Sequence, residues 1–250
     1  MYTSAIISNN FIEIKQQTTP PFVPNSCGGG RKKSLYYTSE QNERNVKSSI
    51  NRARQQIRRL LECNFSEGYT FLTLTFNEDS NHNIRDYDQC YKSFCDFKKR
   101  LAYFLSKQGN CSFKYIGVAE FQEKRAGAIH YHLICNLYYL SKQDLSKLWG
   151  NGWVDIKHIK SSPADNEKIA NYMKKGIADQ RLQQKKKYFR SQGLSEPEYI
   201  TIENEYEFMQ ALNNSSCSHL NSESYYSPMY GEVILSTYYS NNAKELKSHA

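Results

Sequence analysis

The sequence predicts an α+β fold built on a mainly antiparallel sheet, and three observations lead to this prediction. Segments with helical spacing are interspersed with segments in which apolar and polar residues alternate. Two strand-like segments, 113–122 and 128–136, are separated only by a short turn, which is typical of an antiparallel hairpin. Hydrophobic residues make up 39% of the 250 residues, so a wholly disordered chain is excluded.

The elements follow in the order helix, strand, helix, strand, strand, helix, strand, helix. Helices are expected where apolar residues recur three and four positions apart, over 39–63, 87–105, 142–148 and 166–189. Asp165 is the expected N-cap of the last helix. Strands are expected over 69–76, 113–122, 128–136 and 154–159, with a further one over 232–239.

Composition and charge divide the chain into three parts. Residues 1–35 contain proline and glycine clusters and are predicted to be a poorly ordered arm, residues 36–200 form the main domain, and residues 201–250 form an acidic tail rich in Asn, Ser and Tyr. Residues 191–250 hold eight acidic and two basic side chains, a net charge of −6, which leaves +14 on residues 1–190. This asymmetry favours a polyanionic partner for the basic body, and a solvated basic surface is the alternative.

The sequence also bounds the compartment. It contains no run of 18 apolar residues, and its first residues lack the basic and apolar regions of a signal peptide. The seven cysteines are an odd number without framework spacing, which indicates reduced thiols. We therefore expect a cytoplasmic protein without a membrane partner.

One strand carries a candidate metal site. His130 and His132 are two residues apart, so they point to the same face of the strand over 128–136. If the hairpin loop is residues 123–127, Glu120 lies opposite His130 and shares that face. Two histidines and a carboxylate suit a small divalent metal ion, but also non-haem iron oxygenases and zinc hydrolases. Polar residues on a wet sheet face are the simpler alternative.

Two further segments supply residues for this face. Thr73 and Thr75 share one face of the strand over 69–76 and lie beside the histidines if the two strands are neighbours. In the last predicted helix, Tyr172 and Lys175 lie on one helical face. A tyrosine hydroxyl is a weak nucleophile at its ordinary pKa, and a nearby ammonium group and a metal-polarised electrophile are the help it needs.

Together these segments resemble the HUH endonuclease superfamily, and within it the single-tyrosine initiators of rolling-circle replication in plasmids and phages. The resemblance rests on the strand over 71–76, on Glu120-Phe121-Gln122 through His130-Tyr131-His132, and on Tyr172-x-x-Lys175. Weaker similarities are Leu148-Trp149-Gly150-Asn151-Gly152 and the segment 187–197. The resemblance covers roughly residues 65–200.

The resemblance implies a ferredoxin-like sheet with a split βαβ unit and an endonuclease domain over 36–200. It implies that Glu120, His130 and His132 hold Mg²⁺ or Mn²⁺, that Lys175 orients the phosphate, and that Tyr172 forms a 5′-phosphotyrosine. The freed 3′-OH would be extended by a host polymerase. The expected DNA-binding residues are Thr73, Thr75, Arg54, Arg58, Arg59, Lys174 and Lys185.

The implied function is a metal-dependent nickase and strand transferase that starts rolling-circle replication. Its partners would be single-stranded or hairpin origin DNA and a host helicase and polymerase, in the cytoplasm of a bacterial cell. Two alternatives stay open: a single-tyrosine HUH transposase or relaxase, and a non-catalytic protein that binds origin DNA. A zinc or iron enzyme acting on a small molecule would leave the basic body unexplained.

Overall fold

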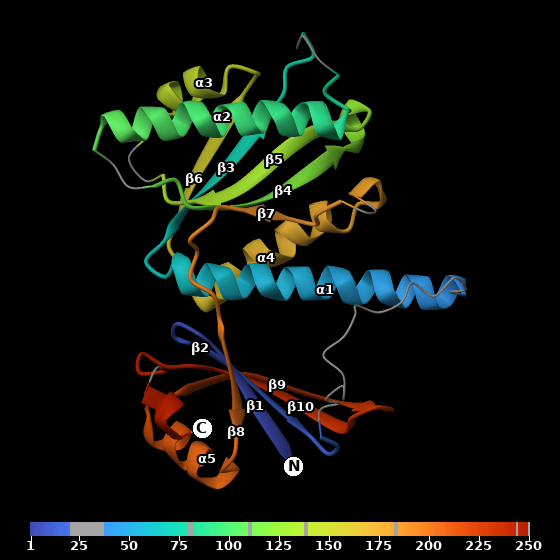
Figure 1. The fold of residues 1–250 in the computed structure, drawn as a ribbon, viewed down its shortest axis with the longest axis vertical. Coiled ribbons are helices and arrows are strands. Elements are labelled where there is room, and N and C mark those ends of the chain that lie inside the picture. The colour runs from blue at the N-terminus through green and yellow to red at the C-terminus, as the bar shows by residue number, and fades with distance from the viewer. Residues whose placement is uncertain are drawn as a thin grey trace, which may run out of the picture. The chain divides into compact units, whose positions relative to one another are not determined.

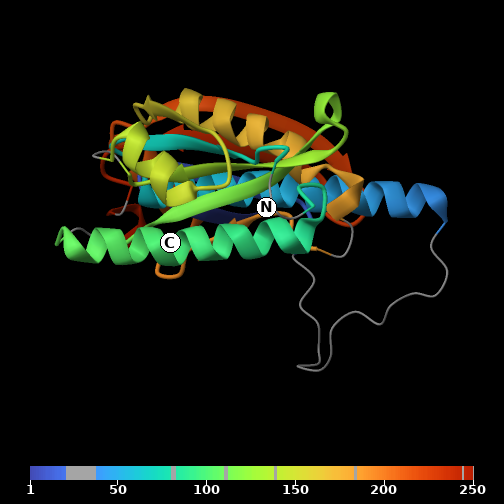
Figure 2. The ribbon, with the colours of Figure 1, turned by 90° about the horizontal axis from the view of Figure 1, so that it is seen from above.

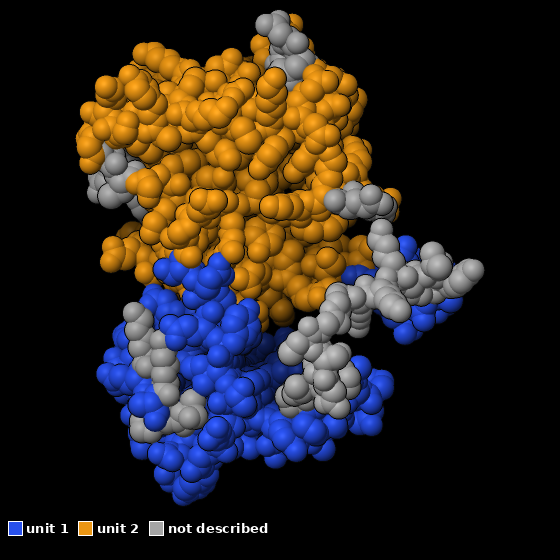
Figure 3. Space-filling view, in the orientation of Figure 1, with its two compact units in different colours: residues 1–45, 195–250 blue, residues 46–194 orange. Residues whose placement is uncertain are grey.

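The computed structural model describes residues 1–20, 38–79, 83–109, 112–137, 140–182, 185–243 and 245–249. The chain forms two compact units, which Figure 3 shows in different colours. The central unit consists of residues 46–194, and the terminal unit consists of residues 1–45 and 195–250. Each unit contains a five-stranded antiparallel sheet accompanied by helices, so the predicted α+β class is confirmed.

The sheet of the central unit has the strand order β6-β3-β5-β4-β7. Its strands are β3 (Tyr69–Thr75), β4 (Tyr115–Gln122), β5 (Ala128–Cys135), β6 (Val154–Ile159) and β7 (Phe189–Arg190). Helix α2 (Tyr87–Lys107) joins β3 to β4, and α3 (Lys142–Trp149) joins β5 to β6. Because β5 is inserted between β3 and β4, the unit has the split βαβ arrangement of a ferredoxin-like fold, as the sequence predicted.

The two faces of this sheet carry separate cores. Leu72, Leu74 and Tyr131 pack into one core with residues of α2 and α3. Phe71 and Ile134 pack into the other with residues of α1 (Ser39–Asn64) and α4 (Pro163–Ile177). Figure 1 shows α2 and α3 on one side of the sheet and α1 and α4 on the other. Strict alternation in β3 and β5 therefore sends His130 and His132 to the side of α1 and α4.

The strand register confirms the pairing expected from the hairpin. Glu120 lies opposite His130 across β4 and β5, and Thr75 lies opposite His130 across β3 and β5. The hairpin connection contains the short 3-10 turn η1 (Glu123–Arg125), visible at the end of the hairpin in Figure 2. Ala126 and Gly127 complete it with φ of +52° and +82°. The connection has an odd number of residues, which keeps Glu120 on the face of the histidines.

Helix α4 is shorter than predicted and has a different cap. Ser162 is its N-cap, and the Ser162 hydroxyl accepts a hydrogen bond from the Asp165 N–H at 3.1 Å. The prediction of Asp165 as the cap is wrong because Pro163 already suits the first turn. The helix ends at Ile177 rather than near Phe189. Leu182 and Phe189 are buried in the core beside α2, which a helix continuing on the opposite side of the sheet could not reach.

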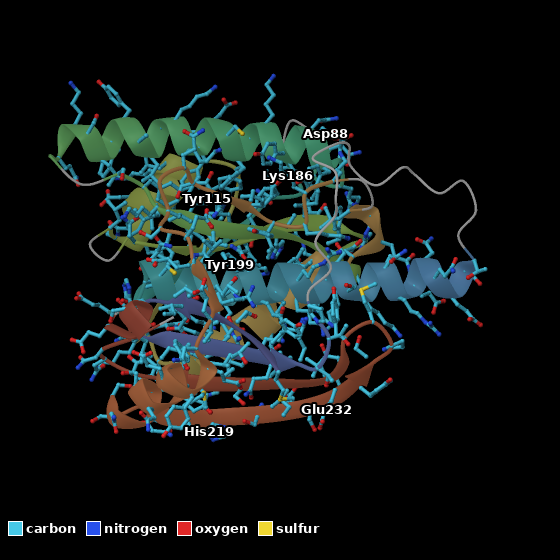
Figure 4. All side chains as sticks on the ribbon, turned by 60° about the horizontal axis from the view of Figure 1, so that its bottom comes forward. Asp88, Tyr115, Lys186, Tyr199, His219 and Glu232 are labelled. Carbon is cyan, nitrogen blue, oxygen red and sulfur yellow. The ribbon has the colours of Figure 1, made fainter. Side chains whose placement is uncertain are left out.

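The terminal unit joins both ends of the chain in one sheet, with the strand order β8-β1-β2-β10-β9. Its strands are β1 (Tyr2–Ser8), β2 (Phe11–Gln17), β8 (Glu198–Ile202), β9 (Ser218–Ser227) and β10 (Gly231–Tyr239). The helix α5 (Glu205–Asn214) and the 3-10 segment η3 (Glu245–His249) supply Phe208, Leu212 and Leu246 to its core. Figure 4 labels His219 on β9 and Glu232 on β10.

This arrangement corrects the prediction of a poorly ordered arm over residues 1–35. Residues 2–17 form a hairpin, and β2 pairs along its whole length with β10 near the C-terminus. The stabilising contacts are distant in sequence, so the composition of the arm alone did not show them. The expected strand over 232–239 is confirmed and belongs to this sheet, so residues 201–250 are not an independent tail. The rest of the predicted arm, residues 21–37, lies outside the described residues.

Candidate active site

An open pocket of about 680 Å³ lies between the sheet of the central unit and α4. Strands β3, β4, β5 and β6 form its floor, and one face of α4 forms its wall. The lining residues are Phe71, Thr73, Glu120, Gln122, His130, His132, Asp155, Lys157, Ile159, Lys168, Ile169, Tyr172 and Lys175. All the residues predicted as nucleophile, phosphate-orienting group and metal ligands therefore line one cavity.

Glu120 links the strands to the helix. Nε2 of His132 donates a hydrogen bond to Oε2 of Glu120 at 2.6 Å, and Nζ of Lys175 lies 2.9 Å from Oε1 of the same carboxylate. On the other side of its ring, Nδ1 of His132 is hydrogen-bonded to Oγ1 of Thr73 at 3.1 Å. The His132 side chain is only 6% exposed. Its orientation is thus fixed by partners on both ring nitrogens.

His130 has a different partner. Arg125 Nη1, from the hairpin connection, donates to Nε2 of His130 at 3.2 Å. The same guanidinium donates through Nη2 to the Phe76 carbonyl and to the Glu78 carboxylate, each at 2.9 Å. Arg125 therefore anchors the end of β3 to the hairpin connection and holds the His130 ring from its outer side.

Tyr172 lies over the histidine-bearing face from α4. Its ring meets His132 edge-on at 5.3 Å and Phe71 edge-on at 5.5 Å between centroids. Phe71 in turn stacks on His132, with ring planes 15° apart. Tyr172 is nevertheless 50% exposed, so its ring is held by packing while the residue stays accessible from the pocket.

The charges around the pocket favour particular protonation states. The pKa of Glu120 is lowered to about 2, chiefly by the hydrogen bond from His132 and also by Lys175. Burial lowers the pKa of His130 to about 4, and the nearby His132 and Arg125 act in the same direction. Burial and the negative charge of Glu120 raise the pKa of Tyr172, whereas Lys175 opposes this rise. At neutral pH Glu120 is therefore ionised, His130 is neutral and Tyr172 is protonated.

These donors suit a small divalent cation by their chemistry. An ionised carboxylate and a neutral imidazole are the forms in which Glu120 and His130 could bind a metal ion, and both share the sheet face of His132. Among the described residues, no three His, Cys, Asp or Glu side chains already converge on one point. Glu120 bonds to His132 instead, and His130 accepts from Arg125. Metal binding would require these two hydrogen bonds to open.

Comparison with known families adds an independent result. Residues 69–177 match a family model of replication-associated proteins, the ORF2 type. This segment belongs to the ORF2 replication-associated protein family. It runs from the first residue of β3 to the last residue of α4, and so contains every predicted ligand and Tyr172. The chain matches no curated protein and no solved structure.

The family assignment gives the protein a role in DNA replication and is consistent with a rolling-circle replication initiator. The replication-associated segment brings its own basic groups to the pocket through Lys157, Lys168 and Lys175. None of the helices in the described part of the chain is long and apolar enough to cross a membrane.

Some predicted DNA-binding residues lie away from this pocket. Arg54 and Arg58 of α1 both form ion pairs with Glu167 of α4, at 2.5 and 2.9 Å, so they join two helices. Lys185 pairs with Asp88, labelled in Figure 4 in the first turn of α2, at 2.7 Å. Their basic patterns indicated phosphate contacts because sequence alone does not show which arginines and lysines have acidic partners.

The other predicted contact residues divide into two groups. Thr73 lines the pocket and Thr75 lies one step along the same strand face. Lys174 is exposed on α4 and Arg59 is partly buried on α1, and neither lines the pocket.

Sequence reasoning missed the contribution of β6. Asp155 and Lys157 line the pocket beside β3, where Asp155 lies opposite Thr73. The alternation of Val154 and Ile156 with these two polar residues was the signal that could have found them. Lys168, one helical turn before Tyr172, was recognised in the sequence only as a position without a second tyrosine.

The approach of α4 to the sheet depends on Gly176. A Cβ added at this position would lie 2.6 Å from the carbonyl oxygen of Ala119 in β4, next to Glu120. The absence of a side chain therefore allows the helix to pack directly on the strand backbone. This close packing brings Lys175 within reach of Glu120.

Gly176→Ala is therefore expected to destabilise the central unit by about 1–2 kcal/mol, although alanine is the better helix former by about 1 kcal/mol. The added methyl group must displace α4 from a backbone atom that cannot rotate away. Denaturant unfolding followed by tryptophan emission measures the effect, because both tryptophans lie in the central unit. Lys174→Ala, on the exposed face of the same helix, is the control. Equal stability of Gly176→Ala and wild type would contradict the packing argument.

Proposed function

We propose that this protein nicks and rejoins single-stranded origin DNA through a covalent bond to Tyr172, and that it thereby starts rolling-circle replication. The observation that supports this most is the placement of Tyr172 against His132 and beside Lys175, over the pocket that Glu120 and His130 also line. A nucleophile, a cationic group and a set of metal-binding donors thus meet at one open cavity. The match to replication-associated proteins supports the replication role.

In the proposed reaction the Tyr172 hydroxyl oxygen attacks the phosphorus of the scissile phosphodiester. A bond forms between this oxygen and phosphorus, and the bond from phosphorus to the 3′ oxygen breaks. The proton lost by the phenol is balanced by the proton gained by the departing 3′ oxygen. The products are a 5′-phosphotyrosine and a free 3′-OH, and attack by a 3′-OH on the phosphotyrosine reverses the step and rejoins DNA.

The side chains around Tyr172 have separate tasks in this reaction. Glu120, His130 and His132 would hold Mg²⁺ or Mn²⁺, which when bound would polarise the scissile phosphate. Lys175, whose side chain is 79% exposed, can leave Glu120 to meet phosphate oxygens and stabilise the negative charge that develops on them. Phe71 and His132 hold the Tyr172 ring by edge contacts and so restrict the direction of attack.

The proposed products indicate the partners. A free 3′-OH is a primer, so a host polymerase would extend it, and a host helicase would separate the strands ahead of it. These events would take place in the cytoplasm of a bacterial cell. A single-tyrosine HUH transposase or relaxase would use the same chemistry, and the match to replication-associated proteins favours the initiator.

The proposal is tested with the full chain, Mn²⁺ and labelled single-stranded DNA carrying origin sequences of candidate replicons. We expect a labelled protein band that survives denaturation and disappears after nuclease and protease treatment. Binding without such a band on any cognate sequence would favour the alternative of a non-catalytic origin-binding protein.

A further inference from the structure

Trp153 has an unusual position for a tryptophan. The chain contains two tryptophans, of which Trp149 is fully buried in the core beside α2 and Trp153 is 77% exposed. Trp153 directly precedes β6, which forms part of the pocket floor. A large aromatic side chain left in solvent on a well-packed unit contributes little to its core, so its position calls for a binding role.

The backbone assigns Trp153 to the active-site face of the sheet. The N–H of Thr75 donates to the Trp153 carbonyl at 2.8 Å, and the N–H of Trp153 donates to the Thr75 carbonyl at 3.0 Å. The two residues are thus directly opposite each other. Thr75 lies opposite His130, and His130 lies opposite Glu120. These four residues form one row across the sheet, on the same face.

The turn that presents Trp153 is fixed at several points. The buried Trp149 indole donates to the Thr75 carbonyl at 2.9 Å, and the Asn77 N–H donates to the Asn151 carbonyl at 2.8 Å. Gly152 has φ of +151°, and a Cβ there would lie 2.6 Å from the Asn77 nitrogen. The backbone before Trp153 therefore lies tightly against the end of β3, and an exposed indole on a fixed turn is preorganised for stacking.

The neighbourhood combines this aromatic ring with positive charge. Asp155, two residues further along the same face and about 7 Å away in Cα spacing, already lines the pocket. The pocket also presents Lys157, Lys168 and Lys175. Basic groups that follow a phosphate backbone, next to an aromatic ring on which a base can stack, are the features that bind single-stranded nucleic acid.

We propose that Trp153 is a base-stacking residue that holds an unpaired nucleobase of the DNA strand whose phosphate enters the pocket. The inference rests on the proposed function for the identity of the ligand as single-stranded DNA, but not on Tyr172 as the nucleophile. Because every base has a π-face, the stacking would position the strand without selecting its sequence.

The test uses full-length Tyr172→Phe protein, so that binding is measured without cleavage. Single-stranded oligo(dT) is expected to quench the emission of Trp153, and Trp153→Ala is expected to weaken its binding about 5- to 100-fold. An abasic strand of the same length keeps the phosphates but lacks the bases, so it should bind both proteins equally. Tyr103→Ala, an exposed aromatic residue on α2, should leave both affinities unchanged.

The outcomes separate this proposal from the proposed function. Emission of the remaining Trp149 verifies that Trp153→Ala is folded. Equal affinity of the two proteins for oligo(dT), or an equal loss on the abasic strand, would overturn the stacking role. Emission that depends on protein concentration but not on DNA would overturn it in favour of a contact between copies of the chain. Failure of the covalent reaction in wild type, with Trp153-dependent stacking intact, would reject only the nicking chemistry.

Discussion

Tyr172→Phe is expected to abolish covalent attachment to single-stranded DNA, with a loss on the order of 10⁴-fold or more. The substitution removes the proposed attacking oxygen and nothing else. The phenylalanine ring keeps the edge contacts with Phe71 and His132, so the helix and the pocket should be unchanged. Non-covalent affinity for the same DNA and the free energy of unfolding are therefore expected to stay near the wild-type values.

The measurement is the yield of denaturation-resistant protein–DNA adduct, with binding followed in parallel by fluorescence anisotropy. Tyr103→Phe is a matched control, because Tyr103 is 67% exposed on α2, on the opposite side of the sheet. This control should react like the wild type. An adduct formed by Tyr172→Phe at wild-type yield would show that another residue is the nucleophile.

Glu120→Gln has the second largest expected effect, a loss of cleavage on the order of 100-fold or more. Glutamine keeps the shape of the side chain but lacks the negative charge that a divalent cation requires and that pairs with Lys175. Chelation of divalent cations with EDTA is expected to abolish cleavage by wild type while non-covalent DNA binding persists. Mn²⁺ binding followed by electron paramagnetic resonance provides a readout that does not depend on activity.

Glu123→Gln is the matched control for this charge change. Glu123 lies in the hairpin connection, its side chain is 84% exposed, and it pairs with Arg181. It does not line the pocket. Cleavage that survives chelation, or Mn²⁺ affinity of Glu120→Gln equal to that of wild type, would contradict the assignment of Glu120 as a metal ligand.

Local patterns in the sequence were sufficient to predict the arrangement of the central sheet. Alternation in β3 and β5 separated Leu72 and Tyr131, which pack in a core, from Thr73 and His132, which line the pocket. The position of Glu120 followed from the parity of a short hairpin connection, because a period of two leaves only two possible faces. Chemistry carried by neighbouring strands is therefore predictable when the turn that joins them is short.

Features set by contacts distant in sequence were not predictable in the same way. The end of α4 at Ile177 depends on the burial of Leu182 and Phe189 in the core beside α2. The strands β1 and β2 depend on pairing with β8 and β10, which come from the other end of the chain. Arg54 and Arg58 have the composition of a phosphate-binding helix, but Glu167 on another helix engages them.

The central claim is that Tyr172 becomes covalently attached to DNA, and peptide mapping of the adduct tests it most directly. Wild-type protein is allowed to react with single-stranded origin DNA and Mn²⁺, and is then digested with nuclease and protease and analysed by tandem mass spectrometry. The account predicts a nucleotide on the peptide that contains Tyr172, attached through its 5′-phosphate. A nucleotide on a different residue, or cleaved DNA with a free 5′-phosphate and no modified peptide, would contradict it.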